Sequence, residues 1–201
     1  MASCILAAQT PIGRIVADQL EKLQLPLSRT QDDPRPVVVM TCGIAGSGKS
    51  TFSKAIVAQQ HPMYERLSVD AMIHAKHGIY GVDYPENMYS EYLEEASDNY
   101  ERRLIELLNS GEKNIAFDRA LYSKKDRDYF KALIEEKGAR WILVFFHPSS
   151  KEVIWNRIQR RRKAEINADS AFVITRDTFD GYWEGFENPE GEGEVVIEVL
   201  A

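Results

Sequence analysis

Residues 37–51 read VVVMTCGIAGSGKST, and this stretch decides the fold. It begins with the β-branched apolar run Val37–Met40, which is typical of a strand buried on both faces of a parallel sheet. The residues Gly43–Ser50 then fit the pattern G-x-x-x-x-G-K-[ST] without a mismatch, and a helical pattern follows at 50–59. A strand, a glycine-rich turn and a helix in this order predict a loop that surrounds phosphate with backbone N–H groups.

The residue types in this loop suit a nucleotide. Lys49 would bring a positive charge to the β and γ phosphates, and the hydroxyl of Ser50 would bind Mg²⁺. A mere tight turn is the alternative, but a turn has no use for a lysine followed by two hydroxyl residues. We therefore expect the nucleotide, taken as ATP, to be bound by Gly43, Ile44, Ala45, Gly46, Ser47, Gly48, Lys49, Ser50 and Thr51.

Apolar strand patterns alternate with helical patterns along the rest of the chain. This alternation predicts right-handed crossovers, so the expected fold class is α/β, a P-loop NTPase with a three-layer α/β/α arrangement and a mostly parallel five-stranded sheet. The expected strands are 37–40, 67–69, 115–117, 142–146 and 195–199, and the expected helices are 50–59, 86–109, 124–136, 151–163 and 176–184.

The first residues are expected to lie outside this domain. Apolar residues between Ile5 and Leu25 recur at three- and four-residue steps, which predicts an amphipathic helix. The turn formers of Ser28–Pro36 predict a linker. We therefore expect a helical arm and linker over 1–36 and a domain over 37–201. The arm is a candidate surface for a protein partner or for a second copy of the chain.

Composition narrows the function classes. The 201 residues carry 25 Lys and Arg against 31 Asp and Glu, a net charge of −6, which argues against nucleic acid as the partner. The two cysteines are too few for a disulfide framework. The longest apolar run, Trp141–Phe146, is far shorter than a membrane helix needs, and no secretion signal is recognisable. We expect a soluble, cytoplasmic protein without a membrane partner.

Two aspartates end predicted strands. Asp70 follows 67–69 and would lie beside the γ-phosphate if that strand neighboured Val37–Met40, where it could accept a proton from an attacking hydroxyl. Its alternative role is an N-cap of the next helix. Asp118 follows 115–117 and could order Mg²⁺ or the acceptor, with Arg119 directly after it. A turn aspartate with a salt-bridging arginine remains the alternative for this pair.

The predicted helix over 151–163 is rich in arginine. Arg157 and Arg161 lie one turn apart and share a face. A basic helix end often forms only a solvated surface. Here it leads into the polar segment 164–170, so we expect an arginine lid over 157–175 that stabilises charge on the transferred phosphoryl group. Ser149 and Glu152 predict a capping box at the start of the helix.

The acceptor region is expected at residues 74–87, and Tyr89, Tyr92 and Tyr100 follow it on a helix. Tyr84 is a candidate substrate contact, although tyrosines at helical spacing are usually half-buried core residues. Arg127 is a candidate anion holder. A guanine reader of the N-K-x-D type is absent, since no Asn is followed by Lys.

Taken together, these motifs resemble the P-loop kinases of the zeta-toxin, chloramphenicol phosphotransferase and polynucleotide kinase type. The resemblance covers about 37–200 and includes the ending Phe186-Glu187-Asn188-Pro189. It implies an ATP- and Mg²⁺-dependent kinase with Asp70 as the base and Lys49 and the lid arginines on the triphosphate. The acceptor would be a small molecule with a hydroxyl group.

Two other functions stay open. One is a nucleotide-binding switch or slow NTPase that acts on a protein partner. The other is a kinase of UDP-sugars, like the toxins of this group, or of nucleic-acid 5′-hydroxyls.

Overall fold

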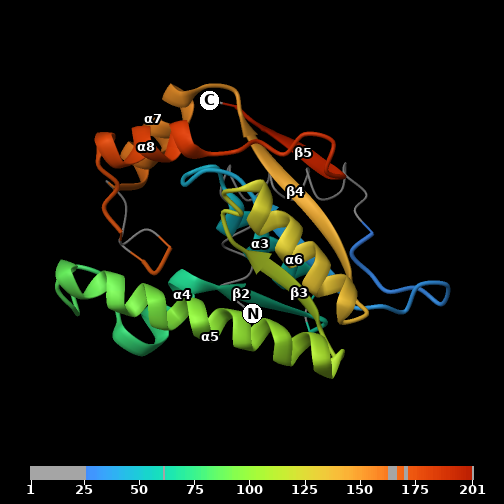
Figure 1. Ribbon diagram of the computed structural model, residues 1–201. Helices are drawn as coiled ribbons and strands as arrows, with labels where there is room; N and C mark the ends of the chain where they lie inside the picture. Colours follow the sequence, from blue (N-terminus) through green and yellow to red (C-terminus); the bar gives the residue numbers. More distant parts are fainter. Residues whose placement is uncertain (1–25, 61, 163–166, 170–171, 201) are drawn as a thin grey trace.

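The computed structural model describes residues 26–60, 62–162, 167–169 and 172–200 (Figure 1). The expected helix within 5–25 lies outside these residues. In chain order the elements are β1 (Val37–Cys42), α3 (Lys49–Gln60), β2 (Tyr64–Ser68), α4 (Val69–His77), the 3-10 helix η1 (Glu86–Met88), α5 (Tyr89–Ser110), β3 (Asn114–Asp118), α6 (Lys124–Glu136), β4 (Arg140–Pro148), α7 (Lys151–Arg162), α8 (Arg176–Gly185) and β5 (Glu194–Val199).

The sheet has five strands in the order β2-β3-β1-β4-β5, and every pairing is parallel. This confirms the predicted α/β class and the five-stranded sheet. The expectation that the strand before Asp70 neighbours β1 is wrong, because β3 lies between them. Asp118 at the end of β3 is therefore the aspartate next to the central strand.

Alternate residues of β1 pack on opposite faces of the sheet. Val37 and Val39 join a core with residues of α3, α7 and α8, while Val38 and Met40 join a second core with residues of α5 and α6. All six residues of β1 are buried. Helices thus cover both faces of the sheet, which gives the three predicted layers (Figure 1).

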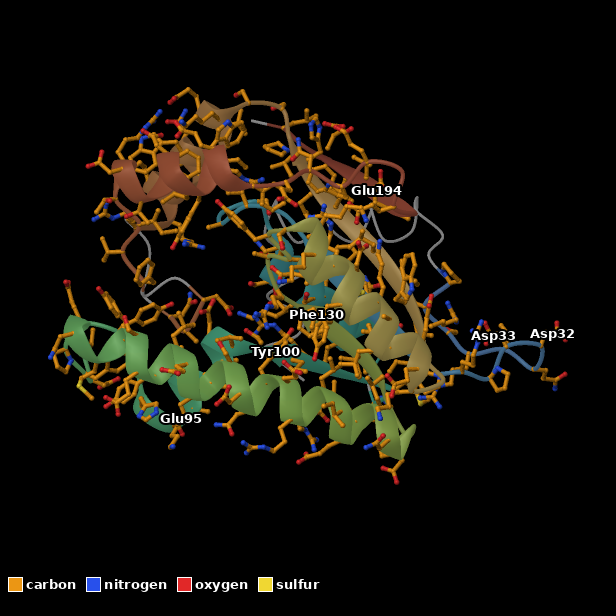
Figure 2. All side chains as sticks on the ribbon, in the orientation of Figure 1. Asp32, Asp33, Glu95, Tyr100, Phe130 and Glu194 are labelled. Atoms are coloured by element: carbon orange, nitrogen blue, oxygen red, sulfur yellow. The ribbon has the colours of Figure 1, made fainter. Side chains whose placement is uncertain are left out.

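The segment before β1 is attached to the domain. Leu27 is buried in the first core, and its carbonyl accepts a hydrogen bond from Tyr64 Oη at 2.7 Å. Arg29 donates to Asn114 Oδ1 at 2.9 Å and to the Gly111 carbonyl at 2.8 Å. The first residues of the linker expected at 28–36 are therefore bound to the domain, whereas the loop with Asp32 and Asp33 projects from the molecule (Figure 2).

Local sequence explains where several helices begin and end. Ser68, Ser123 and Thr175 cap α4, α6 and α8 by accepting from backbone N–H groups of the first turn. Gly111 ends α5 in a left-handed conformation at φ 63°. The predicted capping box at Ser149 is wrong, because Ser150 Oγ accepts from Val153 N–H instead. Among the described helices, none is long and apolar enough to cross a membrane.

Candidate active site

The loop between β1 and α3 has a backbone that only glycine adopts easily. Gly43, Gly46 and Gly48 have φ angles of 149°, 89° and 110°. A Cβ atom on Gly46 would lie 2.8 Å from Ile158 Cγ1 of α7, so this loop also packs tightly against the helix that carries the arginines. The glycines thus form the curled loop that a phosphate cradle needs.

Polar groups in this loop fit an anion. Lys49 Nζ donates to the Ile44 carbonyl at 2.9 Å, and burial lowers the pKa of its ammonium, against the pull of the Asp118 and Asp70 carboxylates. The buried Ser47 Oγ has no hydrogen-bond partner within the described chain. A half-buried cation and an unpaired hydroxyl beside the N-terminus of α3 are suited to bind phosphate oxygens.

Arg66 of β2 binds two aspartates at the carboxyl edge of the sheet. Its Nε and Nη2 atoms donate to Asp118 Oδ2 at 2.9 and 2.5 Å. Nη2 also donates to Asp169 Oδ1 at 2.7 Å, and Lys54 of α3 pairs with the other oxygen of Asp169. Since the side chains of Arg66, Asp118 and Asp169 are only 14%, 4% and 13% exposed, this is a largely buried charge network.

Asp70 lies in the first turn of α4, beside this network. Ser68 caps that helix, so the alternative role of Asp70 as the N-cap is wrong. The residue is exposed to solvent, and it lies at the wall of a pocket. Loss of water, reinforced by the negative charges of Asp169 and Asp118, raises the pKa of this carboxyl group to about 6. A carboxyl group in this range is suited to accept a proton near neutral pH.

The residues fit Mg²⁺ in part. Arg66 binds only Oδ2 of Asp118, and Oδ1 makes no hydrogen bond within the described residues. Ser50 in the first turn of α3 likewise has no hydrogen-bond partner there. No cluster of three metal-ligating side chains occurs in the described chain. A cation here would be held by the Ser50 hydroxyl, the Asp118 carboxylate and the phosphates themselves.

Arg157 and Arg161 are half-buried on α7 and make no hydrogen bond or ion pair with described residues. Burial lowers the pKa of both guanidinium groups, and for Arg161 the Asp70 and Asp169 carboxylates oppose this effect. Arg161 therefore lies near the acidic side of the site. A half-buried guanidinium group without a paired anion is suited to bind one supplied by a ligand.

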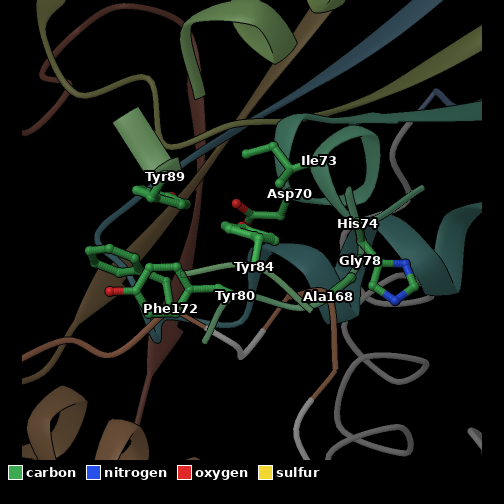
Figure 3. Close-up of a pocket in the computed structure, with 9 residues that line it drawn as sticks. All are labelled: Asp70, Ile73, His74, Gly78, Tyr80, Tyr84, Tyr89, Ala168 and Phe172. Atoms are coloured by element: carbon green, nitrogen blue, oxygen red, sulfur yellow. The ribbon is translucent and has the colours of Figure 1, made fainter. Parts of the chain in front are cut away.

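A pocket opens next to Asp70 (Figure 3). Aromatic rings form much of its wall, and Tyr84, a predicted substrate contact, is among them and is buried. The structure thus brings Tyr84 and Asp70 to the same pocket, and the role of Tyr84 as a substrate contact stays a prediction. The residues lining the pocket are Asp70, Ile73, His74, Gly78, Tyr80, Tyr84, Tyr89, Ala168 and Phe172.

Two predicted site residues have structural roles instead. Arg127 is buried, binds both oxygens of Glu192 at 2.7 and 2.8 Å, and donates to the Leu121 and Glu187 carbonyls. Its donors are thus occupied, so it is not an anion holder. The guanidinium carbon of Arg119 lies 5.4 and 5.3 Å from the ring centres of Tyr100 and Phe130, which point into the space between α5 and α6 (Figure 2).

Sequence reasoning missed Arg66 and Asp169. Arg66 fell outside the expected strand at 67–69, because the real strand begins at Tyr64. The sequence did offer a signal for Arg66, namely an arginine inside a short strand and next to a buried residue. Asp169 lies within the expected lid segment, but its partners are 115 and 103 residues away in sequence, and no local pattern indicates them.

Comparison with known proteins agrees with this geometry. A family model described as an AAA domain matches residues 38–189, most of the chain and all of the site. The chain belongs to this family. It is a P-loop kinase-like domain, as the resemblance in the sequence implied. Among curated proteins, none matches the sequence significantly.

Solved structures share the fold of this AAA domain at low sequence identity. A provisionally named kinase from Chloroflexus aurantiacus has a TM-score of 0.61 and 18% identity, covering 82% of this chain and 85% of the other. A gluconokinase from Sinorhizobium meliloti gives 0.50 and 22%, with 84% of each chain covered. The Mycobacterium tuberculosis APS kinase CysC, in complex with AMPPNP and APS, gives 0.50 and 15%, covering 82% and 88%. The chain therefore has the P-loop kinase fold.

Proposed function

We propose that the protein is an ATP- and Mg²⁺-dependent phosphotransferase that moves the γ-phosphate to a hydroxyl group of a small molecule. One observation carries the proposal. The half-buried side chains of Lys49 and Arg161 form no ion pair with described residues, and the charge of the Asp70 carboxylate, whose pKa is raised, acts on both of them. Phosphate binders and a proton acceptor in one site are what phosphoryl transfer to a hydroxyl requires.

Each residue has a role in the proposed reaction. The loop amides and Lys49 bind the triphosphate, and Asp70 orients the acceptor hydroxyl. As the hydroxyl oxygen bonds to the γ-phosphorus, the bond to the ADP oxygen breaks and the proton passes to the Asp70 carboxylate. Arg161, with Arg157 behind it, stabilises charge on the transferred group. Ser50 and Asp118 would hold Mg²⁺, which neutralises charge on the phosphates.

The structural neighbours support the proposal. They include a gluconokinase and an APS kinase, the latter in complex with AMPPNP and APS. Their identity to this chain is 22% and 15%, so they support the reaction type and leave the acceptor open.

Transfer of label from γ-labelled ATP tests the proposal. The protein is incubated with Mg-ATP and a small-molecule cell extract, and labelled products other than inorganic phosphate are counted. We expect such products with the wild type, and none with Asp70→Asn, which should still bind Mg-ATP in calorimetry. Lys49→Ala should lose binding and transfer together. ATP binding or hydrolysis with no labelled acceptor would favour the nucleotide-switch function instead.

A further inference from the structure

Arg66 and Asp118 project from the same face of the sheet. Strands β2 and β3 pair in parallel, with Arg66 beside Ala116 and Ser68 beside Asp118. Residues paired in this way point to one side, and so do residues two apart on one strand. Ala116 packs in the core that α3 and α7 cover. Arg66 therefore reaches the Asp118 carboxylate by extending forward along its own strand, toward the carboxyl edge of the sheet.

Arg66 binds one oxygen of Asp118 and leaves the other open. Its Nε and Nη2 atoms both donate to Oδ2, at 2.9 and 2.5 Å, whereas Oδ1 makes no hydrogen bond within the described residues. Because a carboxylate is planar, a guanidinium group that holds Oδ2 with two donors also limits the directions in which Oδ1 can point. The contact thus orients the carboxylate as well as balancing its charge.

The Asp118 carboxylate needs this partner because it is buried near the phosphate loop. Only 4% of its side chain is exposed, against 14% for Arg66. Burial lowers the pKa of Lys49, and among the charged groups that act on it Asp118 has the largest effect, in the opposite direction. A buried carboxylate without an opposite charge beside it would be strongly destabilised and drawn toward Lys49, the cation proposed to bind the phosphates. Arg66 thus balances the charge of Asp118 and leaves Lys49 to the nucleotide.

Arg66 is itself held in place before a ligand arrives. Its Nη2 atom also donates to Ser68 Oγ at 3.2 Å, and Ser68 caps α4, the helix that carries Asp70. The same atom donates to Asp169 Oδ1 at 2.7 Å. An arginine loses much rotational freedom when it binds several groups at once, so these extra contacts prepare its geometry in advance.

From these observations we infer that Arg66 is a positioning residue for Mg²⁺, holding the Asp118 carboxylate so that Oδ1 is available to the cation that accompanies ATP. The inference rests on the proposed function, in which Asp118 and Ser50 hold that cation. A residue that orients a metal ligand typically contributes about 10- to 100-fold to metal affinity. Since a lysine offers a single point charge, the role requires the planar guanidinium group and not only its charge.

Calorimetry of ATP binding tests the inference without measuring catalysis. The ratio of the ATP affinity in Mg²⁺ to that in EDTA is the magnesium effect. We expect Arg66→Gln to reduce the magnesium effect about tenfold, and Arg66→Lys, which keeps the charge and disturbs folding less, to reduce it similarly. Asp169→Asn removes the charge of the other aspartate bound by Arg66, and as the matched control it should leave the magnesium effect within about threefold of the wild type. Melting temperatures show that each variant is folded.

A double variant separates positioning from a merely structural role. If Arg66 acts through Asp118, Arg66→Gln should bring no further loss of the magnesium effect once Asp118→Asn has removed the metal ligand. A further loss in that background, or a wild-type magnesium effect in Arg66→Lys, would overturn the inference and leave the proposed function intact. A wild type that binds ATP equally in Mg²⁺ and EDTA, or an undiminished magnesium effect in Asp118→Asn, would overturn the proposed role of Asp118 and the inference together.

Discussion

At the scale of single residues, the ligand-free site holds several ionisable groups away from their preferred state. Burial lowers the pKa values of Lys49 and Arg161 and raises that of Asp70. A bound triphosphate would give both cations an anionic partner, and Asp70 could accept the proton of a hydroxyl group. Such groups lower the stability of the free protein, which is the usual consequence of preparing charges for a ligand.

Replacing Asp70 should therefore stabilise the protein. The pKa of Asp70 in the folded protein, about 6, exceeds the ordinary value of 3.8. Ionisation of this group therefore lowers the free energy of unfolding as the pH rises from 3.8 to about 6, and this loss of stability is complete at pH 7. We expect Asp70→Asn to raise stability by about 1 kcal/mol after solvent screening, or about 2–4 °C in melting temperature. Thermal melts at pH 7 and at a pH below the lower of these two values check this.

The gain from Asp70→Asn should vanish at the acidic end, where both forms are uncharged. A helix-stabilising role gives the reverse result at pH 7, since an anion in the first turn of a helix favours the helix dipole. A lower melting temperature for Asp70→Asn at neutral pH would therefore contradict our interpretation of this carboxyl group.

At the scale of elements, the phosphate loop should not tolerate a side chain at Gly46. Alanine would have to adopt a φ angle of 89° and would place its Cβ 2.8 Å from Ile158. We expect Gly46→Ala to cost about 1–3 kcal/mol of stability and to abolish Mg-ATP binding. Gly181 is the matched control, because it lies within α8 with open space around it, and Gly181→Ala should stabilise by about 0.5–1 kcal/mol. Melts and calorimetry measure both, and unaltered nucleotide binding by Gly46→Ala would contradict the assigned role of the loop.

The pair formed by Arg127 and Glu192 joins α6 to the chain before β5. The two side chains are 1% and 6% exposed, so removing one leaves a buried charge without its partner. We expect Arg127→Met to lose about 3–5 kcal/mol in urea unfolding, and the double variant Arg127→Met with Glu192→Met to lose clearly less. If Arg127→Met kept its stability and weakened acceptor binding instead, the original hypothesis of an anion holder would be restored.

Elements with a clear local pattern could be predicted from the sequence. The helix at Lys124–Glu136 has the expected bounds, because Ser123 caps it and Gly138 with φ of 73° follows its end. Strand β2 was predicted too late and too short, since the two charged residues Glu65 and Arg66 interrupt its apolar pattern at one edge of the sheet. The order of the strands could not be predicted either, because no local signal shows that β3 enters between β2 and β1.

At the scale of the whole molecule, distant parts of the chain meet at one edge of the sheet. The phosphate loop, Asp70, Asp118 and Arg161 could each be recognised from local patterns. Their arrangement depends on Arg66 and Asp169, which connect β2, β3 and the segment after α7 across 52 and 103 residues of sequence. Pairings of this range follow from the packed fold and not from any window of sequence, so local patterns predict candidate site residues one by one but not the network that connects them.

The charges of this network should shift the pKa of Asp70, the proposed base. The value of kcat/KM for transfer should decrease as the pH is lowered below the pKa of Asp70, about 6, because the protonated carboxyl group cannot accept a proton. The charge of Asp169 raises that pKa, so Asp169→Asn should move the acidic limb of the profile to lower pH. Asp177→Asn, at an exposed position in the first turn of α8, is the matched control and should leave the limb in place. If the limb stays unchanged in Asp169→Asn while transfer persists, Asp70 is not the group that titrates, since Asp169 is the largest single charge raising its pKa.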